Sequence, residues 1–237
     1  MAGIIQSLWI GPRLSAMERL SISSFLRHGH PFHLYAYEEV EGVPPGTTIL
    51  DGNRVLPACR IFTYKEQQSY AGFANFFRYK LLLEQGGWWV DADMVCLRPF
   101  DFAGEYVFSS EGINGRQLVN VGALKVPAGS AVMRYAWDAC QQMDPAELKW
   151  SQCGPGLARQ AIEACALEAY VEPPEVFCPV HFSEWESMLD ASRETHFGES
   201  TRGIHLWNEL WRRAGRDKDG RYPSGCLYER LKQRYLE

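Results

Sequence analysis

The chain has 237 residues, of which 46% are hydrophobic, 13% aromatic and 22% charged. These values are typical of a globular protein with a well-buried core, and they exclude a disordered, collagen-like or coiled-coil chain. The formal net charge of -5 excludes a surface built to neutralise many nucleic-acid phosphates. We therefore expect one globular domain that does not bind nucleic acid.

The cysteines and the N-terminal segment bear on the compartment. The seven cysteines are scattered, odd in number and without CxxC spacing, so we interpret them as reduced, mostly buried thiols. The N-terminus lacks a cationic stretch followed by a long apolar one, and no run approaches the roughly 20 apolar residues of a membrane span. These features indicate a cytoplasmic protein.

The first elements alternate between strand and helix. Residues 4–10 form an apolar run closed by Gly11-Pro12, which predicts a buried strand and a turn. Helical spacing predicts a helix over 16–27, and alternation predicts a strand over 32–37. This order favours an α/β fold with a mostly parallel central sheet flanked by helices. Ligands of such sheets bind at the carboxyl ends of the strands.

The central block has the strongest pattern. Residues 41–60 are rich in turn-forming residues and are interpreted as loop. Residues 71–84 carry apolar side chains at helical spacing, and Gly86-Gly87 supplies a helix stop. The strand predicted over 88–90 then delivers Asp91 and Asp93, two residues apart, to the same side of the chain.

The rest of the chain continues the alternation. Strands are predicted over 106–109 and 119–126, and helices over 131–142 and 156–169. A basic amphipathic helix is predicted over 222–237. A solvated face explains that helix, and peripheral contact with an anionic membrane is the alternative. No repeat or linker interrupts the chain, so residues 1–237 are expected to form a single domain.

Asp91-Ala92-Asp93 places two carboxylates where a sheet meets a crevice. Neighbouring carboxylates repel each other unless a cation or a proton lies between them. Oxygen ligands of this kind suit Mn²⁺ or Mg²⁺, ions that join protein carboxylates to a diphosphate. The pair therefore predicts a metal site, with a solvated acidic turn as the alternative.

The residues around this pair resemble a known family. The segment Asn75-Phe-Phe-Arg-Tyr79, followed by Leu81-Leu-Leu-Glu-Gln-Gly-Gly-Trp-Trp-Val-Asp-Ala-Asp93, is similar to the sugar-binding DXD region of glycosyltransferases. That region is shared by capsular-polysaccharide glycosyltransferases, initiating α-mannosyltransferases and large bacterial glucosylating toxins. The resemblance implies a GT-A fold, a nucleotide-diphosphate-sugar donor, a divalent ion and transfer with retention at the anomeric carbon.

The resemblance also implies a role for each matching residue. Asp91 would contact the ribose and the ion, and Asp93 would bind the ion directly. Arg78 would bind donor-sugar hydroxyls and buttress Asp91, although an ion pair on the helix surface with Glu84 or another neighbour is an alternative. Asn75 stands where the family usually has an aspartate that contacts the sugar. An amide can donate and accept hydrogen bonds but carries no charge, so the sugar preference is open.

A late segment resembles the region where related enzymes supply a third metal ligand. His205 would complete the site of Asp91 and Asp93, while Trp207 and Asn208 would meet the diphosphate. A lone histidine is otherwise a structural side chain whose hydrogen bonds are satisfied, and this alternative remains open.

Five further positions are weaker candidates for residues of the site. Trp9 and Ile10, at the end of the first strand, would contact the nucleobase. Asn120 lies in a segment that resembles the lining of the reacting sugar. Gly154 and Pro155 would shape the acceptor side. The structural alternatives are core packing for Trp9 and Ile10, and a strand-edge amide for Asn120. For Gly154 and Pro155 the alternative is an ordinary turn.

The resulting hypothesis is a metal-dependent retaining glycosyltransferase, with Arg78, Asp91 and Asn120 at the reacting centre. Residues 1–100 would form the nucleotide-sugar half, and residues 101–237 the acceptor half with the metal and diphosphate segment. The acceptor would be a glycan, a lipid-linked molecule or another hydroxyl compound, with bacterial surface polysaccharide favoured by the resemblance. An inactive sugar-nucleotide-binding scaffold, suggested by Asn75, is one rival. A phosphotransferase is the other, disfavoured because the acid pair lies deep in the chain.

Overall fold

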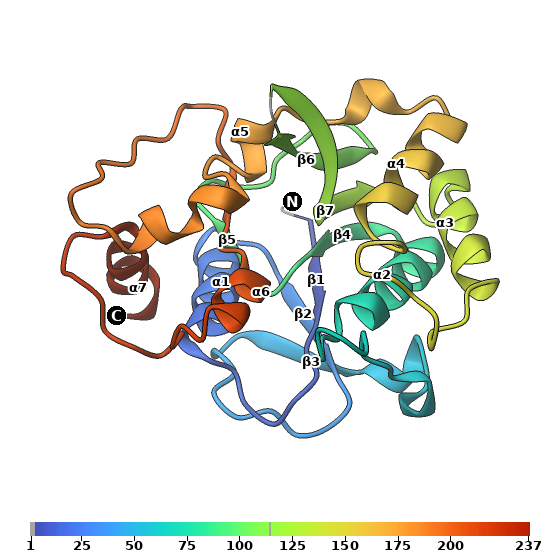
Figure 1. Ribbon diagram of the computed structural model, residues 1–237, viewed down its shortest axis with the longest axis horizontal. Coiled ribbons are helices and arrows are strands. Elements are labelled where there is room, and N and C mark those ends of the chain that lie inside the picture. Colours follow the sequence, from blue (N-terminus) through green and yellow to red (C-terminus); the bar gives the residue numbers. More distant parts are fainter. Residues whose placement is uncertain (1–2, 114) are drawn as a thin grey trace.

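The computed structural model describes residues 3–113 and 115–237. These residues form a six-stranded sheet in the order β3-β2-β1-β4-β7-β6 (Figure 1). The strands are β1 (Ile5–Leu8), β2 (Phe32–Ala36), β3 (Thr47–Asp51), β4 (Gly87–Val90), β6 (Val107–Ile113) and β7 (Arg116–Val126). Strands β3, β2, β1 and β4 are parallel, whereas β7 is antiparallel to both β4 and β6. The predicted α/β fold with a mostly parallel sheet is confirmed.

Helices cover both faces of this sheet (Figure 1). One face packs against α2 (Ala71–Gln85), α3 (Ala131–Gln141) and α4 (Pro155–Ala164), and the other against α1 (Ala16–Arg27), α5 (Pro174–Phe177) and α7 (Leu227–Leu236). Trp88 and Trp89 of β4 are buried in opposite cores, because successive side chains of a strand point to opposite faces. Both faces of β4 are therefore buried, as its continuous apolar run predicts.

The remaining helical segments are short. They are α6 (Asn208–Arg213) and the 3₁₀ helices η1 (Gly52–Arg54), η2 (Ala58–Arg60), η3 (Glu168–Tyr170) and η4 (Phe182–Leu189). In the described part of the chain, every helix is too short or too polar to cross a bilayer.

A glycine pair turns the chain from α2 into β4. Gly86 and Gly87 have φ angles of 64° and 85°, which residues with a Cβ rarely adopt. A Cβ on Gly86 would lie only 2.3 Å from the backbone nitrogen of Ala128. The predicted helix stop is therefore also a point of close backbone approach, and it directs β4 so that Asp91 follows at its carboxyl end.

Two serines precede helices but use their hydroxyls differently. At the start of α1, the Ser15 hydroxyl accepts from the Met17 N–H at 3.2 Å, and the Glu18 carboxylate accepts from the Ser15 N–H at 2.8 Å. At the start of α3, the buried Ser130 hydroxyl has no hydrogen-bond partner among the described residues. Only the first serine is a working cap.

Replacing Ser15 with alanine is therefore expected to lower the free energy of unfolding by about 1 kcal/mol, because N–H groups of α1 lose their acceptor. The Ser130→Ala variant is the matched control. It is expected to be neutral or slightly stabilising, because it removes an unpaired buried hydroxyl. Urea unfolding followed by far-UV circular dichroism measures the free energy of unfolding of both variants. Equal losses of this free energy would contradict the assignment of Ser15 as the helix cap.

The structure corrects three boundaries that the sequence predicted. Residues 41–60 are not all loop, because β3 pairs with β2 as an edge strand; its largely exposed side chains give it no hydrophobic pattern. The helix predicted over 156–169 is α4, which ends at Ala164. The C-terminal helix begins at Leu227 and not at residue 222, because Cys226 caps it.

A second sheet was not predicted at all. It consists of β5 (Met94–Cys96) and β8 (Gly203–His205), which are antiparallel, with Met94 opposite His205. Strands of three residues are too short for alternation to be recognised. Their pairing brings the late histidine back to the end of β4.

Candidate functional site

Two carboxylates lie just beyond the carboxyl end of β4. The Asp91 N–H donates to the Gly122 carbonyl at 2.8 Å, and the Met94 N–H donates to the Asp91 carbonyl at 2.9 Å. The chain therefore makes a turn between β4 and β5. Asp91 is half-buried, and Asp93 is only 6% exposed.

His205 joins the two carboxylates. One ligand atom from each of Asp91, Asp93 and His205 lies within 4.8 Å of the other two. The Nε2 atom of His205 is 3.4 Å from Oδ1 of Asp93, and His205 is 8% exposed. We call these three residues the acidic cluster. Two carboxylates and one imidazole form a donor set that can hold a divalent cation.

Burial and charge act in opposite directions on the Asp93–His205 pair. Burial by itself raises the pKa of a carboxyl group, but the charge and hydrogen bond of His205 outweigh it and lower the pKa of Asp93. Burial by itself lowers the pKa of His205, but Asp93 raises it well above 6.5. Both directions favour a carboxylate beside an imidazolium, and a cation held by His205 would take the place of the ring proton.

Trp207 and Asn208 fix the geometry around His205 and Asp93. The Trp207 ring stacks on the His205 ring, with centroids 4.1 Å apart and planes 29° apart. Its indole N–H donates to the Val180 carbonyl at 3.0 Å, and its φ of 60° is unusual for a residue with a side chain. The Asn208 backbone N–H donates to Oδ2 of Asp93 at 2.7 Å. Trp207 was expected to meet the diphosphate, and in this structure its indole N–H is already bonded to the backbone.

Arg78 of α2 reaches Asp91 across the turn. Its Nη2 is 2.5 Å from Oδ1 of Asp91, which also accepts from the Trp89 indole N–H at 2.9 Å. The guanidinium lies over the Trp89 ring, 4.8 Å from the ring centroid. Arg78 is 2% exposed, and its buried Nε has no partner among the described residues. Glu84 pairs with Lys80 and not with Arg78, so the helix-surface alternative for Arg78 is wrong.

Asn75 lies one turn before Arg78 on α2. Its Oδ1 accepts from Arg78, and its Nδ2 is 3.7 Å from Sγ of Cys153. A Cβ on Gly154 would lie 3.1 Å from Nδ2 of Asn75, and the Gly154 carbonyl accepts from the Tyr79 hydroxyl at 3.1 Å. The turn at Gly154 therefore packs against Asn75. Pro155 follows as the first residue of α4.

Asn120 of β7 lies near His205. Its Oδ1 accepts from the Gly122 N–H at 2.7 Å, and its Nδ2 is 3.5 Å from Oε1 of Glu111 on β6. A Cβ on Gly122 would lie 3.1 Å from Cε1 of His205. Asn120 is 5% exposed, so its amide is part of the packed wall beside the acidic cluster.

Trp9 and Ile10 follow β1 and are both half-buried. The Trp9 backbone N–H donates to the Tyr35 carbonyl at 2.9 Å. The Nζ atom of Lys218 is 5.5 Å from the Trp9 ring centroid and 2.5 Å from Oε1 of Glu18. Core packing and nucleobase contact are both compatible with this position. The sequence did not single out Lys218, because nothing in its local pattern links it to β1.

Two regions of the chain match known families. Residues 32–109 match the family described as "Glycosyltransferase sugar-binding region containing DXD motif". Residues 146–235 match the family described as "Alpha 1,4-glycosyltransferase conserved region". This chain is a glycosyltransferase. The first match contains Arg78, Asp91 and Asp93, and the second contains His205. The comparison with curated protein sequences found no match to the glycosyltransferase.

Solved structures share the fold of this glycosyltransferase. "PaToxG Glycosyltransferase" is 14% identical and superimposes with a TM-score of 0.53, covering 99% of this chain and 87% of that one. An active-site mutant of LgtC is 10% identical and superimposes with a TM-score of 0.52, covering 99% of this chain and 97% of that one. The likeness establishes a GT-A fold.

Cys178 is a neighbour of the acidic cluster that sequence reasoning missed. All seven cysteines lie in the described part of the glycosyltransferase and are free thiols. Burial raises the pKa of the Cys178 thiol, whereas its contact with the His205 ring lowers it. The Nδ1 atom of His205 makes no well-formed hydrogen bond to the described residues. Nothing in the cysteine spacing marks this position.

Proposed function

We propose that the glycosyltransferase moves a hexose from a nucleotide-diphosphate sugar to an acceptor hydroxyl, with a divalent ion and with retention at the anomeric carbon. The acidic cluster, with Arg78 bonded to Asp91, is the observation that carries this proposal. The match of residues 32–109 to a sugar-binding DXD region supports a sugar donor. The alpha 1,4 description of the second matching family supports retention, because an α product made from an α-linked donor keeps its configuration.

The residues of the acidic cluster fit a divalent ion. Asp93 and His205 are buried, and one ligand atom from each of the three residues lies within 4.8 Å of the other two, so a single ion could contact all three. The oxygen donors suit either Mn²⁺ or Mg²⁺, and the imidazole nitrogen favours Mn²⁺, because Mg²⁺ binds mainly oxygen. Such an ion would supply positive charge beside the departing nucleotide diphosphate.

The contacts to the donor would come from both parts of the chain. In residues 1–100, Trp9 and Ile10 would contact the base, and Asp91 would contact the ribose. The unpartnered Nε of Arg78 is available to a hydroxyl of the donor sugar, and the neutral Asn75 amide would hold a second one. Residues 101–237 contribute His205 and Asn120, together with Trp207 and Asn208 beside the diphosphate.

The proposed chemistry requires no protein nucleophile. Arg78, Asp91 and Asn120 would hold the donor sugar so that the acceptor approaches the face from which the diphosphate leaves. The acceptor proton would pass to an oxygen of that leaving group. Within this proposal, the enzyme is cytoplasmic and serves synthesis of a bacterial surface polysaccharide, as the resemblance of residues 75–93 suggests.

A panel of nucleotide sugars tests the proposal. We expect one donor to be turned over with Mn²⁺ or Mg²⁺ and to be stable with EDTA. Nucleotide release measures the rate, and NMR of the product sugar measures the anomeric configuration. Binding of a donor with no turnover would instead favour the inactive scaffold. Turnover that persists in EDTA, or an inverted product, would contradict the metal or the retaining mechanism respectively.

A further inference from the structure

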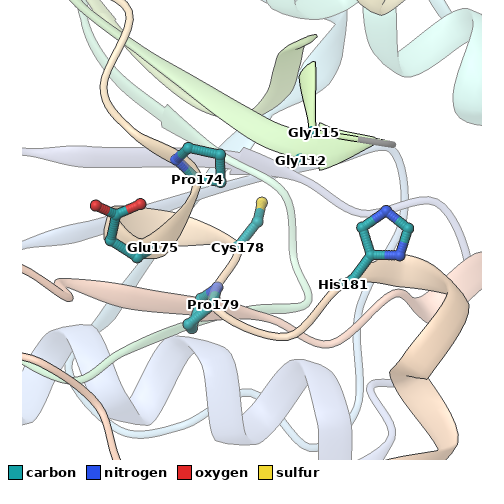
Figure 2. Close-up of a pocket in the computed structure, with 7 residues that line it drawn as sticks. All are labelled: Gly112, Gly115, Pro174, Glu175, Cys178, Pro179 and His181. Carbon is teal, nitrogen blue, oxygen red and sulfur yellow. The ribbon is translucent and has the colours of Figure 1, made fainter. Parts of the chain in front are cut away.

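A cavity of about 480 Å³ opens between the end of β6 and the segment that follows α5. Its lining includes Gly112 of β6, Pro174 and Glu175 of α5, and Cys178, Pro179 and His181 beyond it. In Figure 2, the Cys178 thiol points into the space between Pro174 and His181. The volume is within the usual range for small-molecule sites. We call this space the α5 cavity.

The α5 cavity adjoins the acidic cluster through one wall. Cys178 lines the cavity, and its thiol contacts the ring of the proposed metal ligand His205. The same segment is anchored to the cluster a second time, because Val180 accepts from the Trp207 indole, which stacks on His205. The segment after α5 therefore contacts both the cavity and the residues around His205.

A second connection runs from the cavity lining to Asn120 through β6. Gly112, which lines the cavity, directly follows Glu111 on β6. The Glu111 carboxylate is 3.5 Å from Nδ2 of Asn120. The cavity lining is thus connected, through Glu111 and through Cys178, to two of the residues of the second half of the chain that the proposed function places around the donor, namely Asn120 and His205.

The lining selects for a neutral, hydroxylated ligand. Its described residues include no lysine or arginine, so an anionic group such as a phosphate has no cationic partner there. Pro174 and Pro179 offer apolar surfaces, and Glu175 offers acceptor oxygens. His181 Nδ1 accepts from the Ser183 N–H at 3.1 Å, which leaves Nε2 as the ring nitrogen that can donate. That buried Nε2 has no partner among the described residues.

We propose that the α5 cavity binds the acceptor and that the acceptor group held there is an uncharged carbohydrate. This inference rests on the proposed function and identifies the acceptor class and its side of the site. The acceptor oxygen forms a bond to the anomeric carbon as the bond from that carbon to the diphosphate breaks, and the hydroxyl proton leaves with the nucleotide diphosphate. A phosphate-linked carrier would have to place its phosphate outside the cavity.

This location differs from the acceptor side that the sequence suggested. Gly154 packs against Asn75, which lies on the far side of Arg78 from the acidic cluster. The turn at Gly154 and Pro155 thus supports a donor contact. The α5 cavity, in contrast, borders His205 through Cys178.

Filling the cavity tests the assignment. At Gly112, an added Cβ meets only Pro174 Cγ, at 3.8 Å, so Gly112→Leu adds volume without a clash at Cβ. The control is Gly198→Leu, because an added Cβ at exposed Gly198 also meets one atom, Ser200 Oγ, at 3.8 Å. Donor turnover by the full chain is measured alone and with methyl glycosides of common hexoses, including glucose, galactose, mannose and N-acetylglucosamine.

We expect at least one glycoside to accelerate donor turnover by the unaltered chain and by Gly198→Leu. Gly112→Leu is expected to keep the glycoside-free rate and to lose about tenfold or more of the acceleration, because the cavity is filled. His181→Ala is a second variant. For this variant, we expect the glycoside concentration at which donor turnover reaches half of its full acceleration to rise several-fold.

Two outcomes would overturn the acceptor assignment. One is donor turnover that no glycoside accelerates, and the other is acceleration that Gly112→Leu and His181→Ala leave unchanged. Failure of the proposed function is distinct from both, because the unaltered chain would then turn over no donor under any metal condition. Circular dichroism of each variant separates loss of the cavity from loss of the fold.

Discussion

Replacing Asp93 with asparagine is expected to lower metal-dependent donor turnover by about 10³-fold or more. The variant removes one charge from a site where Asp93 is 6% exposed, and loss of several kcal/mol of electrostatic stabilisation corresponds to this factor. The asparagine oxygen can still accept from the Asn208 N–H, as Oδ2 of Asp93 does at 2.7 Å. The fold should therefore survive, and initial rates of nucleotide release with Mn²⁺ measure the effect.

Asp138→Asn is the matched control for this variant. Asp138 is exposed on α3, and its carboxylate accepts a hydrogen bond from Gln141 at 3.3 Å. Donor turnover by the Asp138→Asn variant should therefore equal that of the unaltered chain. Thermal unfolding supplies a readout that does not depend on activity. At an ion concentration of 100 Kd, binding stabilises the folded state by about 2.7 kcal/mol. We expect Mn²⁺ to raise the Tm of the unaltered chain and of Asp138→Asn, but not of Asp93→Asn. An equal Tm shift in all three would place the ion elsewhere.

Replacing Arg78 with methionine is expected to lower the free energy of unfolding by about 3 kcal/mol and donor turnover by about 10²-fold. Arg78 is 2% exposed and bonds to both Asn75 and Asp91. Its loss leaves the Asn75 oxygen without its donor and removes the cationic partner of Asp91, whose Oδ1 keeps only the Trp89 indole N–H. Breaking a buried ion pair usually costs about 3 to 5 kcal/mol, and we expect the lower value here because Asp91 is partly exposed. Urea unfolding and donor kinetics measure the two effects.

A lysine at the same position separates the structural role of Arg78 from its role toward the donor. Arg78→Lys keeps the charge but not the planar fork that reaches both partners, so it should recover part of the stability and little of the turnover. Arg159→Met is the surface control. Arg159 pairs with Glu163 at 2.8 Å on the solvent-facing side of α4, and its loss should change stability by less than about 0.5 kcal/mol. Full recovery of turnover in Arg78→Lys would show that charge alone is required.

The sequence by itself determined the part of the site that is continuous along the chain. Residues 75–93 contain a helix, a glycine stop, a strand and an acid pair, and each produces a local signal that does not depend on distant residues. The positive φ angles of Gly86 and Gly87, and the burial of Trp88 and Trp89 in opposite cores, agree with those signals. The sequence also marked Asn75 as unusual, but not that its amide bonds to Arg78 and approaches Cys153.

Only the tertiary structure decided what lies opposite this segment. His205 meets Asp93 because β5 and β8, each of three residues, pair in one register, and Trp207 then stacks on the histidine. Such short strands carry no periodicity, and their register depends on packing between segments far apart in the chain. The α5 cavity has the same origin, because β6 and the segment after α5 line it together. Local patterns in the sequence can identify the residues that carry the chemistry, but a space between distant segments exists only once the chain has folded.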